Sequence, residues 1–128
     1  MPEVLEYAEE HNWGADFYMA SVYNLSLDSD RVSSAITGKP NEGERFEESD
    51  IPVMYEMIRK TPKPCLAFKI LGAGRRCTTQ EEVRSAFHEA FANIKATDCV
   101  VVGMYPKNED QAALDCQYTE EAIRIAGK

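Results

Sequence analysis

The sequence lacks any long apolar run and any excess of positive charge. Its 128 residues include 14 Lys and Arg against 22 Asp and Glu, which gives a net charge of -8 at pH 7. Nucleic acids and anionic membranes attract basic surfaces, so this balance argues against both as partners. No stretch approaches the roughly 20 apolar residues of a membrane span. The first residues are rich in glutamate where a signal peptide would be basic and then apolar, so we expect a cytoplasmic protein.

Cysteine and histidine are also scarce, and the four cysteines form no Cys-x-x-Cys pair. This spacing fits a reduced cytoplasmic compartment best, with disulfides between the four cysteines as the alternative. Two of the cysteines lie in strand-like runs, where we expect them to be small buried hydrophobic residues, namely Cys65 and Cys99.

The length and composition predict one soluble globular domain over residues 1–128, with 44% hydrophobic and 28% charged residues. The one long loop, at about residues 38–50, is acidic and contains no histidine. We interpret it as a solvated connection, with a lid over a ligand as the alternative.

The apolar pattern predicts helices and strands in alternation. We expect a helix over residues 2–12, then strands at 15–23, 65–71 and 98–104, each followed by a helix. Thr79 and Glu82 form a capping box before a helix with a clear apolar stripe. Asn108 and Gln111 suggest the start of the last helix. Its expected inward residues are Ala112, Ala113, Cys116, Ala122 and Ile125.

Alternation of strands and helices predicts an α/β fold with a parallel sheet covered by helices. Three strands are few, because an open three-stranded sheet leaves two edges exposed and a full barrel takes about 250 residues. The sequence therefore predicts half of a (β/α)8 TIM barrel, made of about three parallel βα units preceded by a helix.

A glycine-rich turn follows the central strand. Gly72, Ala73 and Gly74 precede Arg75 and Arg76. Free backbone N–H groups together with guanidinium groups favour an anion such as phosphate. The alternative is an ordinary flexible turn with two solvated arginines.

Three stretches, in order, resemble the C-terminal half of the aldo/keto reductase family, and the resemblance covers nearly the whole chain. Residues 2–7 and 16–24 resemble the family's fifth helix and sixth strand, which ends in Tyr-Asn. Residues 66–75 resemble its seventh strand, and residues 100–104 its eighth.

The resemblance implies a coenzyme site for NADP(H) or NAD(H). Phe68 matches the ring that stacks on the nicotinamide, and Asn24 lies at the same end. Lys69, Leu71 and Gly72 match the segment around the pyrophosphate, beside Gly74 and Arg75 of the turn. The segment on the adenosine side contains Gly103, Met104, Tyr105 and Lys107.

The family's catalytic Asp, Tyr, Lys and His belong to the first half of the barrel, and no stretch here matches their motifs. Our leading hypothesis is therefore a half-barrel that keeps part of a coenzyme or phosphate site without independent reductase activity. A second hypothesis is a homo-oligomer, or a pair with a complementary half-barrel, that binds an anion or another small ligand. A third is a different barrel enzyme, a lyase or isomerase, that uses Lys69 as a nucleophile.

Overall fold

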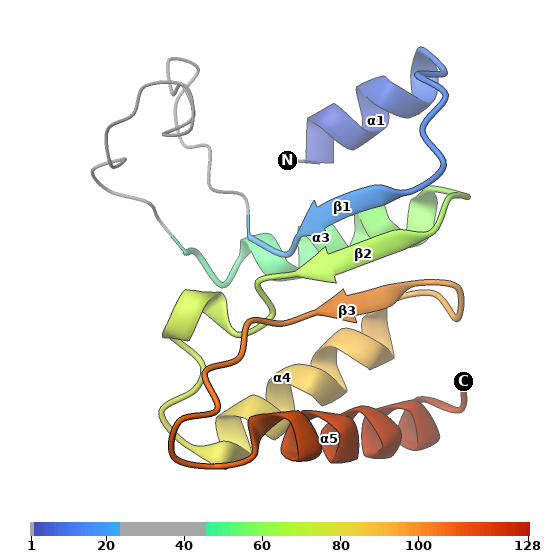
Figure 1. Ribbon diagram of the computed structural model, residues 1–128. Coiled ribbons are helices and arrows are strands. Elements are labelled where there is room, and N and C mark those ends of the chain that lie inside the picture. The colour runs from blue at the N-terminus through green and yellow to red at the C-terminus, as the bar shows by residue number, and fades with distance from the viewer. Residues whose placement is uncertain (1, 24–45) are drawn as a thin grey trace.

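The structure, a computed structural model, describes residues 2–23 and 46–128. These residues form α1 (Pro2–Glu10), β1 (Tyr18–Ser21), α3 (Asp50–Lys60), β2 (Cys65–Phe68), the short 3-10 helix η1 (Gly72–Gly74), α4 (Gln80–Asn93), β3 (Cys99–Val101) and α5 (Gln111–Ala126) (Figure 1). The α/β fold class and the predicted order of elements are confirmed. Asn24 and residues 38–45 of the acidic loop lie outside the described residues.

The three strands form one parallel sheet in the order β1-β2-β3. The register places Ala20, Ala67 and Val100 in one row across the sheet, and Met19, Leu66 and Cys99 in the next. Because successive side chains of a strand point to opposite faces, these two rows belong to opposite faces of the sheet. Both β1 and β3 are edge strands within the described part of the chain.

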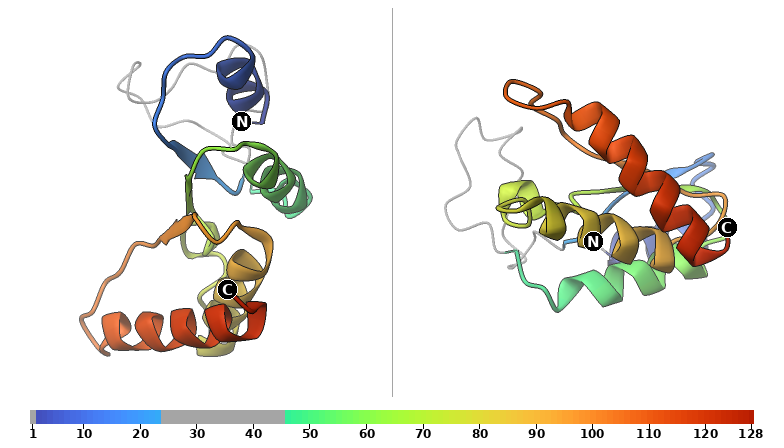
Figure 2. Two further views of the ribbon diagram at one scale, coloured as in Figure 1. Left: turned by 90° about the vertical axis from the view of Figure 1, so that its right-hand side faces the viewer. Right: turned by 90° about the horizontal axis from the view of Figure 1, so that it is seen from below.

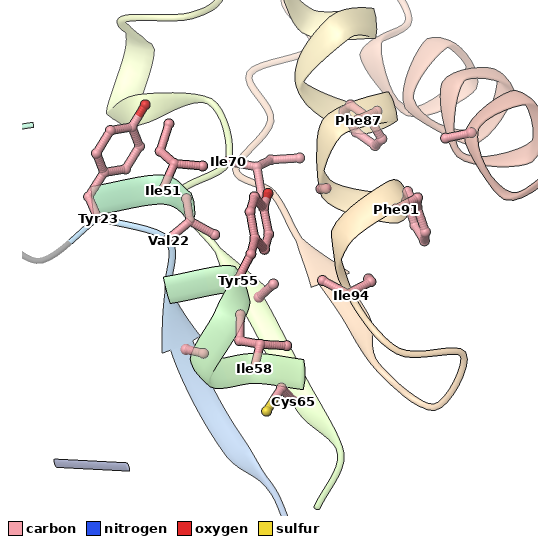
Figure 3. Packing of buried hydrophobic residues seen from close by; sticks show 14 of the residues in the cluster. Val22, Tyr23, Ile51, Tyr55, Ile58, Cys65, Ile70, Phe87, Phe91 and Ile94 are labelled. Atoms are coloured by element: carbon pink, nitrogen blue, oxygen red, sulfur yellow. The ribbon is translucent and has the colours of Figure 1, made fainter. Parts of the chain in front are cut away.

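The face that contains Ala20 and Ala67 is covered by helices. The left view of Figure 2 shows α3 and α4 on the same side of the strands. Their inward side chains and the sheet form one buried cluster, in which Ile58 is 0% exposed and Cys65 is 1% exposed (Figure 3). Small side chains on the strands let the helices approach, and large side chains on the helices fill the space between.

Helix α4 begins and packs as the sequence predicts. The Thr79 hydroxyl accepts a hydrogen bond from the Glu82 N–H at 3.2 Å, and the Glu82 carboxylate accepts one from the Thr79 N–H at 3.3 Å. The predicted apolar stripe is buried throughout: Val83, Ala86, Phe87, Ala90, Phe91 and Ile94. The capping box and the stripe together fix where this helix starts and which way it faces.

The strands are shorter than predicted. β2 ends at Phe68, because Lys69 adopts a φ of 65° and turns the chain out of the sheet. The expected burial of Cys99 is wrong, since its side chain is exposed on the face opposite the helices. Met19, in the same row, is 55% exposed.

The prediction for α5 is wrong about its cap and most of its inward face. Asp110, rather than Asn108, caps the helix, through a hydrogen bond from the Ala113 N–H at 3.1 Å. Tyr118 and Ala122 are buried, and Leu114 packs against the same cluster. Of the five residues expected to face inward, only Ala122 does so; the exposed ones are Ala112, Ala113, Cys116 and Ile125.

An ion pair attaches α5 to α4. The Arg84 guanidinium donates from Nε to the Glu121 carboxylate at 2.9 Å and makes a second hydrogen bond to the same group. The hydrogen bond to Arg84 lowers the pKa of Glu121. His88 lies beside this pair, with its Nε2 3.6 Å from the Glu121 carboxylate. These contacts fix the position of α5 relative to α4.

Among the described helices, none is long and apolar enough to cross a membrane.

Candidate functional site

A pocket of about 640 Å³ lies where β2 and β3 end. Figure 1 shows that η1, the link after β3 and the start of α5 all lie at the end of the sheet to which the strands point. Ligands of parallel α/β sheets bind outside the carboxyl ends of the strands, so this is the position expected of a binding site. The side chains that line it are mostly apolar and come from β2, β3, η1, α4, the link and α5.

The pocket brings together most of the residues that the sequence indicated. Two stretches more than 25 residues apart in the chain, one after β2 and one after β3, face each other across it. Seven of the ten predicted residues that the structure describes line it: Phe68, Lys69, Leu71, Gly74, Gly103, Met104 and Tyr105.

Lys69 has an unusual backbone at the mouth of the pocket. Its φ of 65° lies in the left-handed region, which few residues other than glycine adopt. Its Nζ lies 5.6 Å from the centre of the Phe46 ring and 5.9 Å from that of Phe68, within the range of cation–π contacts. Strained backbone of this kind is commonly retained at functional sites. Here the residue that adopts it, Lys69, lines the pocket together with the ring of Phe68.

Most backbone N–H groups of the glycine-rich turn are not free to bind an anion. Four of the five donors from Gly72 to Arg76 are used within the turn itself: Gly72 N donates to Lys69 O at 2.8 Å, Gly74 N and Arg76 N to Leu71 O, and Arg75 N to Gly72 O. Gly72 is buried, and a Cβ added there would lie 3.2 Å from the Tyr23 hydroxyl. The turn is therefore a packed structural element beside the pocket, and not the open cradle considered from its sequence.

The two arginines after the turn have partners within the protein. The Arg75 guanidinium lies 3.8 Å from the centre of the Phe46 ring and donates to Gly72 O at 3.1 Å. Arg76 pairs with the Glu89 carboxylate at 2.6 Å. Both line a separate hollow of about 410 Å³ that also contains the carboxylates of Glu48, Glu81 and Glu82. This mixture of charges does not favour a phosphate.

Lys107 lies outside the pocket. It is exposed on the link between β3 and α5, and it is absent from the pocket lining. The link is held by the Gln111 side chain, whose amide oxygen accepts a hydrogen bond from the Tyr105 N–H at 2.6 Å. Lys69 is therefore the one lysine or arginine among the described lining residues.

Polar side chains that the sequence did not single out also line the pocket. Gln80 accepts a hydrogen bond from the Tyr118 hydroxyl at 3.1 Å and donates to the Glu109 carboxylate at 2.8 Å. Asp115, on the second turn of α5, is different. Its carboxylate has no hydrogen-bond or ion-pair partner among residues 2–23 and 46–128.

The surroundings of Asp115 disfavour its charged form. Burial raises the pKa of the Asp115 carboxyl above its ordinary value. The signal that could have found it is the spacing of Leu114, Tyr118 and Ala122, which are four residues apart and define the buried stripe of α5. A residue next to Leu114 borders that stripe.

Among the described residues, no group of three or more His, Cys, Asp or Glu side chains could hold a metal ion. No protein-family model, curated protein or solved structure matches this chain. The function is therefore inferred from the pocket and from the residues that line it.

Proposed function

We propose that this chain binds a nicotinamide coenzyme, NAD(H) or NADP(H), in the pocket at the ends of β2 and β3, without catalysing reduction by itself. The observation that carries the proposal is the convergence of seven predicted residues on one pocket. Six of them match positions on the coenzyme side of aldo/keto reductases, and the seventh, Gly74, belongs to the glycine-rich turn.

The chemistry of the pocket fits part of such a coenzyme. Phe68 offers a ring to a nicotinamide or adenine, and aromatic pairs add about 0.5–1.5 kcal/mol beyond burial. A Cβ at Gly103 would meet nothing within 4 Å, so there is open space beside the backbone there. Lys69 supplies the one positive side chain of the described lining to a phosphate. The fit is better for the aromatic and ribose portions than for the pyrophosphate, because most N–H groups of the turn are already used.

When bound, the coenzyme would supply hydride transfer. The residues of this chain would bind and orient it, since no stretch matches the family's catalytic Asp, Tyr, Lys and His motifs. The proposed architecture is half of a (β/α)8 barrel. It is supported by the parallel strands, the helices on one side of the sheet and the pocket at the carboxyl ends of the strands.

Calorimetric titration with NADH and NADPH tests the proposal. We expect saturable binding of at least one coenzyme, weakened about tenfold in Phe68→Ala through loss of the stacking ring. Phe17→Ala is the matched control, because Phe17 is 52% exposed and does not line the pocket. Failure of both coenzymes to bind would overturn the proposal, as would equal weakening in the two variants. Turnover of a simple aldehyde with NADPH, abolished in Phe68→Ala, would contradict the absence of independent activity.

A second candidate function is self-association with ligand binding at the same pocket. It is favoured by the sheet face opposite the helices, where Met19 is 55% and Val101 is 41% exposed, and by the two edge strands. If β1 of one copy pairs with β3 of a second copy, the free backbone N–H and C=O groups of these edge strands form hydrogen bonds. The second copy also covers the apolar face. Light scattering at micromolar concentration should then give twice the monomer mass or more, and Met19→Lys should lower it. A monomer would count against this function.

The third hypothesis, a lyase or isomerase that uses Lys69 as a Schiff-base lysine, stays a prediction. Lys69 does line the pocket, which this chemistry requires. Borohydride treatment with a small aldehyde or ketone should then label Lys69 and leave Lys107 unlabelled. Absence of a labelled lysine in the pocket would exclude it.

A further inference from the structure

The Asp115 carboxylate stands apart from the other polar groups of the pocket. Gln80 and Gln111, which line it too, already form hydrogen bonds to Tyr118, Glu109 and the Tyr105 N–H. Asp115 forms none with the described residues. A partly buried carboxylate without a donor is unfavourable, because water is lost and nothing in the protein replaces it. A ligand that brings a donor removes this cost.

The charges of the pocket limit which ligand can do so. Lys69 and Asp115 are its charged side chains among the described residues, and they come from different elements, the end of β2 and the second turn of α5. No lysine or arginine of the described lining comes from α5 or from the link before it, and Lys107 is exposed outside the pocket. A phosphate near Asp115 would meet a like charge, and neither α5 nor the link contributes a lysine or arginine of the described lining to offset it.

We propose that Asp115 sets the specificity of the pocket: its carboxylate accepts hydrogen bonds from the hydroxyls of an unphosphorylated ribose, so the chain binds NAD(H) in preference to NADP(H). This inference rests on the proposed coenzyme function. An acidic residue that accepts from a ribose 2′-hydroxyl is the usual determinant of NAD in dinucleotide sites, and a basic residue there accommodates the 2′-phosphate. Among the described lining residues, α5 and the link before it contribute the first kind of residue and not the second, because the one basic side chain, Lys69, comes from the segment after β2.

The burial that raises the pKa of Asp115 agrees with this role. A carboxylate partly shielded from bulk water forms stronger hydrogen bonds to a ligand than a fully exposed one does, because the local dielectric is lower. The same low dielectric strengthens its repulsion of a phosphate. Asp115 therefore controls how strongly the pocket prefers NAD(H) to NADP(H).

The test compares dissociation constants for NADH and NADPH in the wild-type chain, in Asp115→Asn and in Glu120→Gln. The wild type should bind NADH at least about tenfold more tightly, a difference of roughly 1.4 kcal/mol, because the 2′-phosphate of NADPH would meet the Asp115 carboxylate. Asp115→Asn should bring the ratio of the two constants close to one. Glu120→Gln removes one negative charge from an exposed position of the same helix, outside the pocket, so it should leave the ratio unchanged.

The outcomes separate the inference from the proposed function. Binding of both coenzymes with equal affinity, or tighter binding of NADPH, overturns the inference and leaves the coenzyme function standing. A ratio that changes equally in Asp115→Asn and Glu120→Gln also overturns it, since net charge alone would then be responsible. If neither coenzyme binds, the coenzyme function fails and the inference with it. Circular dichroism checks that each variant is folded. If Asp115→Asn does not fold, the ratio of the NADH and NADPH dissociation constants in the wild type alone tests the inference.

Discussion

The two faces of the sheet differ in what covers them. On one face, Ala20 and Ala67 lie beneath α3 and α4 and are 1% and 0% exposed. On the other, Met19 and Val101 are 55% and 41% exposed, and the left view of Figure 2 shows α3 and α4 on the opposite side of the strands. Both faces are apolar in sequence, so hydrophobicity alone does not distinguish them. The covered face belongs to the stability of the fold, and the open face and the strand ends are available to a ligand or a partner.

Adjacent positions on β1 test this difference most severely. In Ala20→Lys, a charge enters the covered face, where it has neither water nor a counter-ion, so we expect a loss of more than about 4 kcal/mol of unfolding free energy. Such a loss would leave little folded protein, because small domains are stable by roughly 5–15 kcal/mol. In Met19→Lys, the same side chain enters the open face, and we expect a change within about 1 kcal/mol. Urea denaturation followed by circular dichroism measures both.

A large loss in Met19→Lys at concentrations where the chain is monomeric would contradict the comparison. Light scattering on the same samples separates a loss of folding from a loss of self-association. A Met19→Lys chain that is folded but smaller in mass than the wild type would show that a second copy covers the open face.

The turn between β2 and α4 is the border between the two regions. Replacing its glycines by alanine should lower the free energy of unfolding by different amounts. Gly72 has a φ of 58°, and an added Cβ would lie 3.2 Å from both Arg75 Cβ and the Tyr23 hydroxyl. We expect Gly72→Ala to lose about 2–3 kcal/mol from left-handed strain and crowding. Gly74 has a φ of 98° with open space, so Gly74→Ala should lose about 1–2 kcal/mol from strain alone. Gly103→Ala, with neither constraint, should be within about 0.5 kcal/mol of the wild type.

Equal losses at Gly72 and Gly103, measured by urea denaturation, would contradict this order. They would mean that the turn is not packed against Tyr23 in solution. Its N–H groups would then be free for an anion, and the first interpretation of the Gly72–Arg76 sequence would return.

The elements with strong local signals could be predicted from the sequence. The capping box at Thr79 and the stripe from Val83 to Ile94 are properties of one helix, and both are confirmed. The strand ends could not be predicted, because β2 stops where Lys69 adopts a positive φ, which its side chain does not require. The exposure of Cys99 depends on which face the helices cover, and a run of apolar residues does not specify that.

The candidate site was predicted in part for the same reason. Residues 68–74 and 103–105 bear recognisable motifs and converge because parallel strands end at the same edge of the sheet. Asp115 has no motif. Locating it requires the orientation of α5, which Leu114 and Tyr118 determine. The small residues on the other side of the helix suggest an inward face there, but that side is exposed. Most donors of the turn form hydrogen bonds to neighbouring residues, which the glycine-rich sequence alone does not reveal.

The smallest expected effect concerns the stability cost of Asp115. Burial raises the pKa of its carboxyl in the folded protein, so the folded state favours the protonated form. Any penalty for the charged form is therefore absent at pH values below the unfolded pKa and present in full above the folded one. Asp115→Asn should raise the melting temperature at pH 7 by about 1–4 °C, and the gain should shrink as the pH falls toward the ordinary range of aspartate near 4. Glu120→Gln, at an exposed position of the same helix, should give no such gain. A residue whose removal stabilises the fold while it abolishes coenzyme discrimination is retained for binding, and a drop in melting temperature in Asp115→Asn would instead assign Asp115 to the fold.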